Sequence, residues 1–430
     1  MTYSKSDNKF YIYCFLIIFF LFSSIFILSF FHILNMWAFS QSHLNYSQGF
    51  IRRGLFGSLM LWFNSFFNIP TKYFFWFFFT ILNTLNIFLF LKLIKKFIHN
   101  KIIFLFIAFN PALLLFSFYD IGGYSRFDTI SIFLIILHST IANKIYENKL
   151  TINQYQNYLY FLFVPLITIS FLIHEIQLFI LVFHFIIANN IFNFKEKNNK
   201  VWLTFLIITI VYFLILFFFG SLDQTSMSRI IQDLQNKELW PEPLLQFQTS
   251  SFKEMKNSYE HVFTYNVLSP YNLRLYIFFY TIAVVPFILL FFFLRKNNYY
   301  SSNNLKVEHI FIFIIPLLAG WVIGDLGRWI NITSFCIICF ASQIPLRKKI
   351  NSIKFIKQPY QILCVNLIII TIITIYLLFI RIPHCCDLEK KNLGIWGGFF
   401  NKIITIIKVV TDTKGNLREI KLSNYSYLNK

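Results

Sequence analysis

The chain has 430 residues, of which 57% are hydrophobic, 21% are aromatic and only 13% are charged. This composition, with a mean hydropathy of +0.62, excludes a soluble domain with a single core and indicates a membrane protein. The formal net charge of +20 would suggest a nucleic-acid partner in a soluble protein. Here the basic residues follow the positive-inside rule instead, so we expect no nucleic acid.

Apolar runs long enough to cross a bilayer predict eleven membrane-spanning helices. They lie near residues 10–37, 72–91, 102–118, 129–143, 158–173, 176–192, 201–220, 273–294, 309–323, 331–345 and 361–382. The first run is too long for the apolar part of a secretory signal and has no small-residue cleavage site after it, so we expect an uncleaved span. The predicted fold is an all-α polytopic bundle, with a transmembrane domain over 1–382 and a polar tail over 383–430.

The distribution of basic residues predicts a cytoplasmic N-terminus. Half of the 38 Lys and Arg residues then fall on the cytoplasmic side, while the outer segment 221–272 holds four basic and six acidic residues. That segment is one enlarged periplasmic loop, either a lid over a site or a plain connector. We expect a multi-pass protein of the bacterial inner membrane. An odd error in the span count would move the tail from the periplasm to the cytoplasm.

The first outer segment carries paired arginines, Arg52 and Arg53, and we expect it to lead into an interfacial or re-entrant helix that ends before Pro70. Outward arginines violate the positive-inside rule, so something should favour them. Phosphate is one candidate, because guanidinium binds it bidentately and keeps its charge near lipid. Snorkelling to lipid headgroups is the other.

The second outer loop places Asp120, Arg126 and Asp128 between two apolar runs, and Asn110-Pro111 should kink the helix before it. One interpretation is a carboxylate that orients or deprotonates a sugar hydroxyl, beside an arginine for phosphate. The other is a structural ion pair between Arg126 and Asp128.

Two further polar points lie on the same predicted side. His174-Glu175 separates two apolar runs, and Glu175 is the only Asp, Glu, Lys or Arg between Lys149 and Lys195. Such a carboxylate usually faces a cavity, although a helix turn at the surface is the alternative. Asp325 and Arg328 are three residues apart and suit either an intrahelical ion pair or a role in the site.

The remaining titratable residues give weaker signals. Single histidines inside spans, His32, His138 and His184, are read as polar packing residues in preference to ligands. The six cysteines form no convincing metal-ligand set. The sequence has no phosphate loop, zinc motif, dinucleotide fingerprint or Ser-His-Asp pattern, which argues against ATP-driven, zinc-dependent and redox chemistry. We therefore expect neither a cofactor nor a metal.

An N-inside bundle with arginine-bearing outer loops and one enlarged outer loop resembles the polyprenyl-phosphate-dependent glycan enzymes of bacterial envelopes. These include the GT-C glycosyltransferases and the O-antigen polymerases and ligases. The resemblance is architectural and covers the whole chain. The acidic pair that many GT-C enzymes carry in their first outer loop is absent here, where Arg52 and Arg53 stand instead, and this departure favours the polymerase-like interpretation.

The leading hypothesis is an inner-membrane glycosyltransferase that joins polyprenyl-(pyro)phosphate-linked sugars at the periplasmic face, foremost a polymerase of a surface polysaccharide such as O-antigen or capsule. The expected groups divide into substrate-binding and catalytic residues. The former are Arg52, Arg53, Asp120, Arg126 and Arg328, and the latter are Asp128, His174, Glu175 and Asp325. The expected partners are polyprenyl-linked glycans, the lipid bilayer and other glycan-assembly proteins. The alternatives are a GT-C type single-sugar transferase, a transporter or flippase, and a non-catalytic scaffold or phage-defence component.

Overall fold

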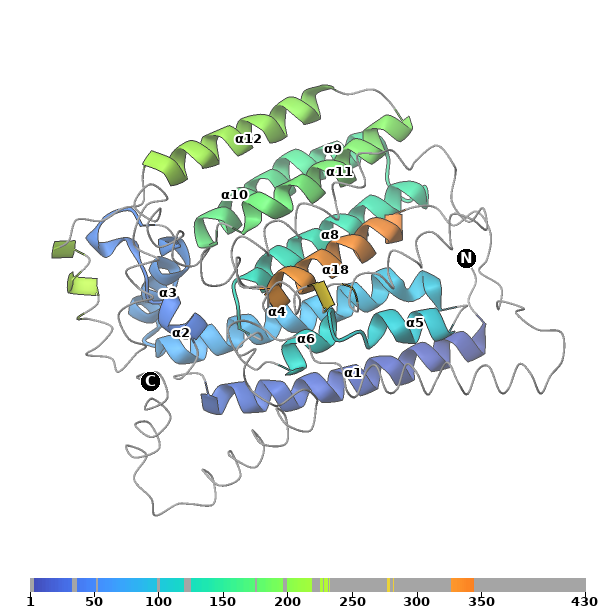
Figure 1. Cartoon of the computed structure of the whole chain (residues 1–430), viewed down its shortest axis with the longest axis horizontal. Helices are drawn as coiled ribbons and strands as arrows, with labels where there is room; N and C mark the ends of the chain where they lie inside the picture. Colours follow the sequence, from blue (N-terminus) through green and yellow to red (C-terminus); the bar gives the residue numbers. More distant parts are fainter. Residues whose placement is uncertain are drawn as a thin grey trace, which may run out of the picture.

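The computed structural model describes residues 4–32, 37–51, 53–98, 101–119, 125–174, 176–195, 199–218 and 326–343, with a few positions between 225 and 281. Every regular element in this part of the chain is helical. The long helices lie roughly side by side along one direction, while the short helices α2 and α3 gather at one end (Figure 1).

Four helices in the described residues are long and apolar enough to cross a membrane. They cover Lys5–Ile27, Thr71–Phe97, Asp128–Tyr146 and Ile152–Ile173. These helices support a multi-pass membrane protein. The described chain is helical over most of seven expected spans besides 102–118, while the expected spans 273–294, 309–323 and 361–382 lie almost wholly outside the described residues. The count of eleven and the orientation therefore remain predictions.

The helices follow the apolar runs of the sequence closely. Their bounds are α1 Lys5–His32, α2 Trp37–Gln41, α3 Gly54–Phe67, α4 Thr71–Ile94, α5 Lys101–Ala108, α6 Leu114–Tyr119, α8 Asp128–Tyr146, α9 Ile152–Tyr158, α10 Val164–Ile173, α11 Gln177–Lys195, α12 Asn199–Phe218 and α18 Leu326–Gln343. The 3₁₀ turns Tyr46–Gln48 and Lys95–Phe97 and the π turn Leu159–Phe163 complete the list.

The expected span 102–118 is broken into α5 and α6, which agrees with the kink expected at Asn110-Pro111. Pro111 has no N–H to continue a helix, and Asn110 accepts a hydrogen bond from the Ala112 N–H at 2.8 Å through its side chain. The break matters for the site because it leaves the carbonyl groups of Ala112 and Leu113 available to another helix.

Helix α18 is the centre of the described bundle. Every side chain from Trp329 to Gln343 is buried, and α18 packs against α8, α4 and α11. Figure 1 shows α8 and α18 between the group of α9 to α12 on one side and the group of α4, α5, α6 and α1 on the other. The N-terminal end of α18 thus lies within reach of side chains from several helices.

Candidate functional site

Asp128 lies in the first turn of α8 and is 5% exposed. A carboxylate there interacts favourably with the positive end of the helix dipole. Burial of the same carboxylate removes it from water and requires a charged partner. The buried carboxylate at the start of α8 therefore needs a charged partner.

The partner is Arg328, in the first turn of α18 and 200 residues further along the chain. Its Nη2 donates to Asp128 Oδ1 at 2.7 Å, and its Nε contacts Oδ2, so the guanidinium addresses both carboxylate oxygens. The two side chains are 16% and 7% exposed. This buried bidentate pair fixes the start of α8 against the start of α18.

His174, at the end of α10, is the third residue of this group. It ends α10 with an extended backbone, φ −158° and ψ 124°, and α11 begins at Gln177. The break expected at His174-Glu175 is therefore present. The His174 Nε2 atom lies 2.8 Å from Arg328 Nη2 and 3.9 Å from Asp128 Oδ1.

The main chain decides which nitrogen of His174 carries the proton. The Ile176 N–H donates to Nδ1 at 3.1 Å, so a neutral ring bears its hydrogen on Nε2. Nε2 and Arg328 Nη2 are then two donor atoms near the same oxygen, Asp128 Oδ1, at 3.9 and 2.7 Å. Such a pair of donors can also hold an oxygen acceptor of a ligand.

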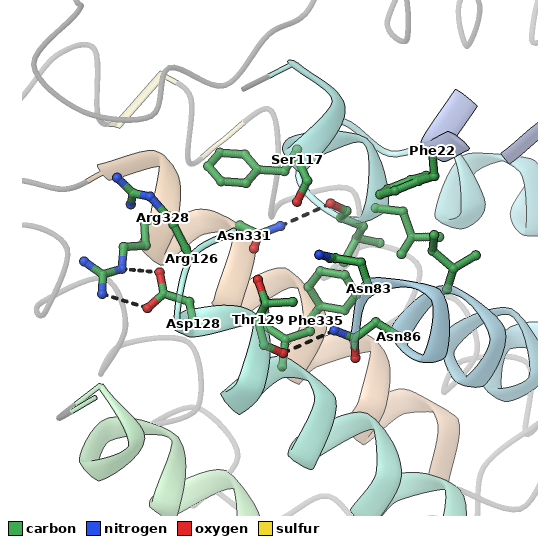
Figure 2. Close-up of a pocket in the computed structure, with 15 residues that line it drawn as sticks. Phe22, Asn83, Asn86, Ser117, Arg126, Asp128, Thr129, Arg328, Asn331 and Phe335 are labelled. Carbon is green, nitrogen blue, oxygen red and sulfur yellow. Dashed lines mark hydrogen bonds and ion pairs between the residues drawn. The ribbon is translucent and has the colours of Figure 1, made fainter. Parts of the chain in front are cut away.

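The group opens onto a cavity of about 30 Å³, lined by Arg126 and by residues of α1, α4, α8, α18 and the α5–α6 segment (Figure 2). Arg126, Arg328 and Asp128 all line it. Among the described residues, two guanidinium groups stand beside one carboxylate and give this wall a net positive charge. The other polar side chains of the described lining are neutral: Asn83, Asn86, Ser117, Thr129 and Asn331.

The first outer segment builds a separate, tightly packed structure. A methyl group on Gly57 would overlap the Leu44 carbonyl oxygen, so α3 can approach this segment only with glycine there. Arg53 precedes α3 with φ 67°, a left-handed conformation. Burial raises the pKa of Tyr46 to about 12, which keeps this phenol neutral.

The expected site residues thus divide into three sets. Arg126, Asp128, His174 and Arg328 are described and meet at the cavity or the ion pair. Arg53 is described and does not line the cavity. Arg52, Asp120, Glu175 and Asp325 lie outside the described residues. Among the described residues, Asp128 forms its ion pair with Arg328 of another helix and not with Arg126.

Sequence reasoning missed a second polar group, 10 residues further along α8 from Asp128. His138 Nδ1 lies 2.9 Å from His184 Nδ1, and His138 Nε2 lies 2.7 Å from Tyr155 Oη. All three side chains are fully buried. Each histidine alone is typical of a packing residue inside a span. The signal for their contact was the equal spacing of His138 from Asp128 and of His184 from His174.

The asparagines of the cavity were also missed. Asn83 and Asn86 are three residues apart in a largely apolar run, which places them on one face of α4. Asn331 occupies an apolar run of α18. Polar amides inside apolar spans usually face a partner or a cavity, and this was the available signal.

No protein family, no curated protein and no solved structure matches the chain. Inference about its function therefore rests on the residues of the site.

Proposed function

We propose that the chain is a membrane glycosyltransferase that takes sugars from polyprenyl-(pyro)phosphate carriers at the periplasmic face of a bacterial inner membrane, and that it polymerises a surface polysaccharide. The observation that carries this proposal is the convergence of Asp128, His174 and Arg328 beside a positively charged cavity with neutral polar walls. Such a cavity suits a ligand with one anionic part and one polar uncharged part.

The phosphate of the carrier would lie against Arg126 and Arg328. Guanidinium groups bind phosphate oxygens through parallel N–H donors, and their fixed charge stabilises the negative charge that develops as the carrier leaves. The Nε2–H of His174 supplies a third donor near Arg328. Apolar helices around the cavity would hold the polyprenyl chain.

In the proposed reaction, a hydroxyl oxygen of the acceptor sugar attacks the anomeric carbon of the donor sugar. The bond from that carbon to the phosphate oxygen breaks, and its electron pair stays on the phosphate. The hydroxyl proton passes to the carboxylate of Asp128, or to Glu175 with His174. A carrier phosphate competes with Asp128 for Arg328, which would loosen the ion pair and leave the carboxylate able to accept a proton.

The test is a gel of the surface glycan from cells with and without the gene, rescued by the wild type, by Arg126→Ala or by the double variant Arg126→Ala/Glu175→Ala. Lys149→Ala is the matched control, because Lys149 pairs with Glu147 in an exposed turn between α8 and α9. We expect the control to restore the ladder and the double variant to fail. Collapse of the ladder to one repeat supports a polymerase, and a small uniform mobility shift supports a single-sugar transferase. A normal ladder from a folded, expressed double variant would contradict the proposal.

A transporter or flippase is the second candidate, and the buried His138–His184–Tyr155 group favours it. Transport predicts polar groups at more than one depth, and this group lies about 15 Å from Asp128 at the rise of an α-helix. Movement of a fluorescent polyprenyl-linked sugar across vesicles containing the purified chain, with no new glycosidic product, would support transport over transfer.

A further inference from the structure

The cavity beside the Asp128–Arg328 pair has amide groups whose orientation is fixed by the backbone. Asn331 Nδ2 donates to the Ala112 carbonyl at 2.9 Å and to the Leu113 carbonyl at 3.1 Å. Both carbonyls belong to the break between α5 and α6. Because the NH₂ group of Asn331 is engaged twice, its Oδ1 is the atom that remains for a ligand (Figure 2).

Asn86 repeats this arrangement from α4. Its Nδ2 donates to the Thr129 carbonyl at 3.2 Å, which again fixes the amide. The side chain is 4% exposed, and its Oδ1 has no hydrogen-bond partner among the described residues. A buried acceptor without a donor destabilises the folded state. The cavity is the place from which a donor can reach it.

The chemistry of the walls restricts what that donor can be. Two carbonyl oxygens require N–H or O–H donors, and the neighbouring guanidinium groups of Arg126 and Arg328 disfavour a cationic amine. A neutral hydroxyl satisfies both conditions. The Phe335 ring, also in the wall, offers an apolar surface of the kind that packs against the C–H face of a sugar ring.

We propose that Asn86 and Asn331 form a sugar-hydroxyl subsite, in which their carbonyl oxygens accept hydroxyl protons from the sugar while Arg126 and Arg328 hold the phosphate. This inference rests on the proposed function and names the part of the carrier that the cavity recognises. Side chains at the mouth of the cavity must separate to admit the sugar, because Asn86 Oδ1 is closed off from solvent.

The experiment measures binding of two probes to the full-length chain in nanodiscs: undecaprenyl phosphate, and undecaprenyl phosphate bearing glucose, galactose, mannose or N-acetylglucosamine. The wild type should bind at least one sugar-bearing probe about tenfold more tightly than the bare phosphate, a ratio equivalent to about 1.4 kcal/mol. Asn86→Leu should lose this preference and keep its affinity for the bare phosphate. Asn143→Leu, in α8 and outside the cavity lining, is the matched control and should behave as the wild type.

The possible results separate the two proposals. Absence of binding of every probe would contradict the proposed function. Binding of the bare phosphate with no sugar preference in the wild type would overturn the subsite alone. A preference that survives in Asn86→Leu would also overturn it, and would mean that Asn86 Oδ1 is satisfied only by water. If Asn86→Leu does not fold, Asn86→Gln and Asn331→Leu should each show the same loss of preference.

Discussion

Helix α8 contributes to two polar groups, and the two groups differ in charge and in access. Asp128 and His174 meet Arg328 beside a cavity, whereas His138 and His184 meet Tyr155 in a closed interior. The first group contains a buried ion pair, for which loss of either partner leaves an uncompensated charge. The second consists of uncharged hydrogen-bonding groups. The first group, here called the open group, can exchange one of its partners for a ligand. The second, here called the closed group, is suited to hold the helices together.

The largest effect is expected for Asp128→Leu, which leaves the Arg328 guanidinium without its carboxylate. Breaking a buried ion pair in this way destabilises a protein by about 3–5 kcal/mol. The double variant Asp128→Leu/Arg328→Met removes both charges and should recover most of that loss, while remaining inactive. Thermal unfolding in detergent, followed by tryptophan fluorescence, tests both. Equal stability of the single and double variants would show that the pair does not act as a unit.

A smaller effect is expected at the closed group. His138→Leu removes the central member, so the Tyr155 hydroxyl and His184 Nδ1 lose their contacts inside the bundle. Each buried group left without a partner lowers stability by about 1–3 kcal/mol. The unfolding temperature should fall, yet the surface glycan of cells carrying the variant should remain normal. Loss of the glycan from a well-folded His138→Leu protein would give the closed group a functional role.

His174→Gln tests the role of the imidazole in the open group. Glutamine keeps an acceptor and a donor but cannot present the Nε2–H that the Ile176 contact imposes on the imidazole. We expect stability to change by less than about 1 kcal/mol, and glycan transfer to fall by about 10²-fold, the lower range for loss of an acid–base group. A variant as active as the wild type would remove His174 from the mechanism.

The smallest effect is expected for Thr151→Ala at the start of α9, the helix that carries Tyr155. Thr151 and Gln154 form a capping box, in which the Thr151 hydroxyl accepts from the Gln154 N–H at 3.3 Å and the Gln154 side chain accepts from the Thr151 N–H at 3.0 Å. Loss of such a cap lowers stability by about 1 kcal/mol. Thermal unfolding should show a small decrease with no change in glycan. A decrease as large as that of His138→Leu would mean that the cap determines the position of Tyr155.

Local features of the fold were predictable because each depends on neighbouring residues. The apolar runs predicted α1, α4 and α8, and Pro111 predicted the break between α5 and α6. His174 indicated the end of α10. Pro165 has a local effect too, since the helix through 152–173 includes a π turn just before it. In each case the covalent structure or the polarity of a short segment determines where a helix begins, ends or bends.

Partner choice within the site was not predictable, because it depends on how distant helices pack. Asp128 had Arg126 two residues away, yet its bidentate partner comes from α18. Asn86 and Asn331 likewise meet one cavity from helices about 240 residues apart in sequence. Polarity indicates that a side chain needs a partner, whereas the crossing of the helices determines which partner is within reach.

The contact between α8 and α11 also limits how the bundle can move. Sliding either helix along the other by one turn would separate His138 from His184. An opening of the cavity that keeps this contact would therefore move α8 and α11 together. Displacement of α18 would release Arg328 from Asp128 and leave the histidine contact intact.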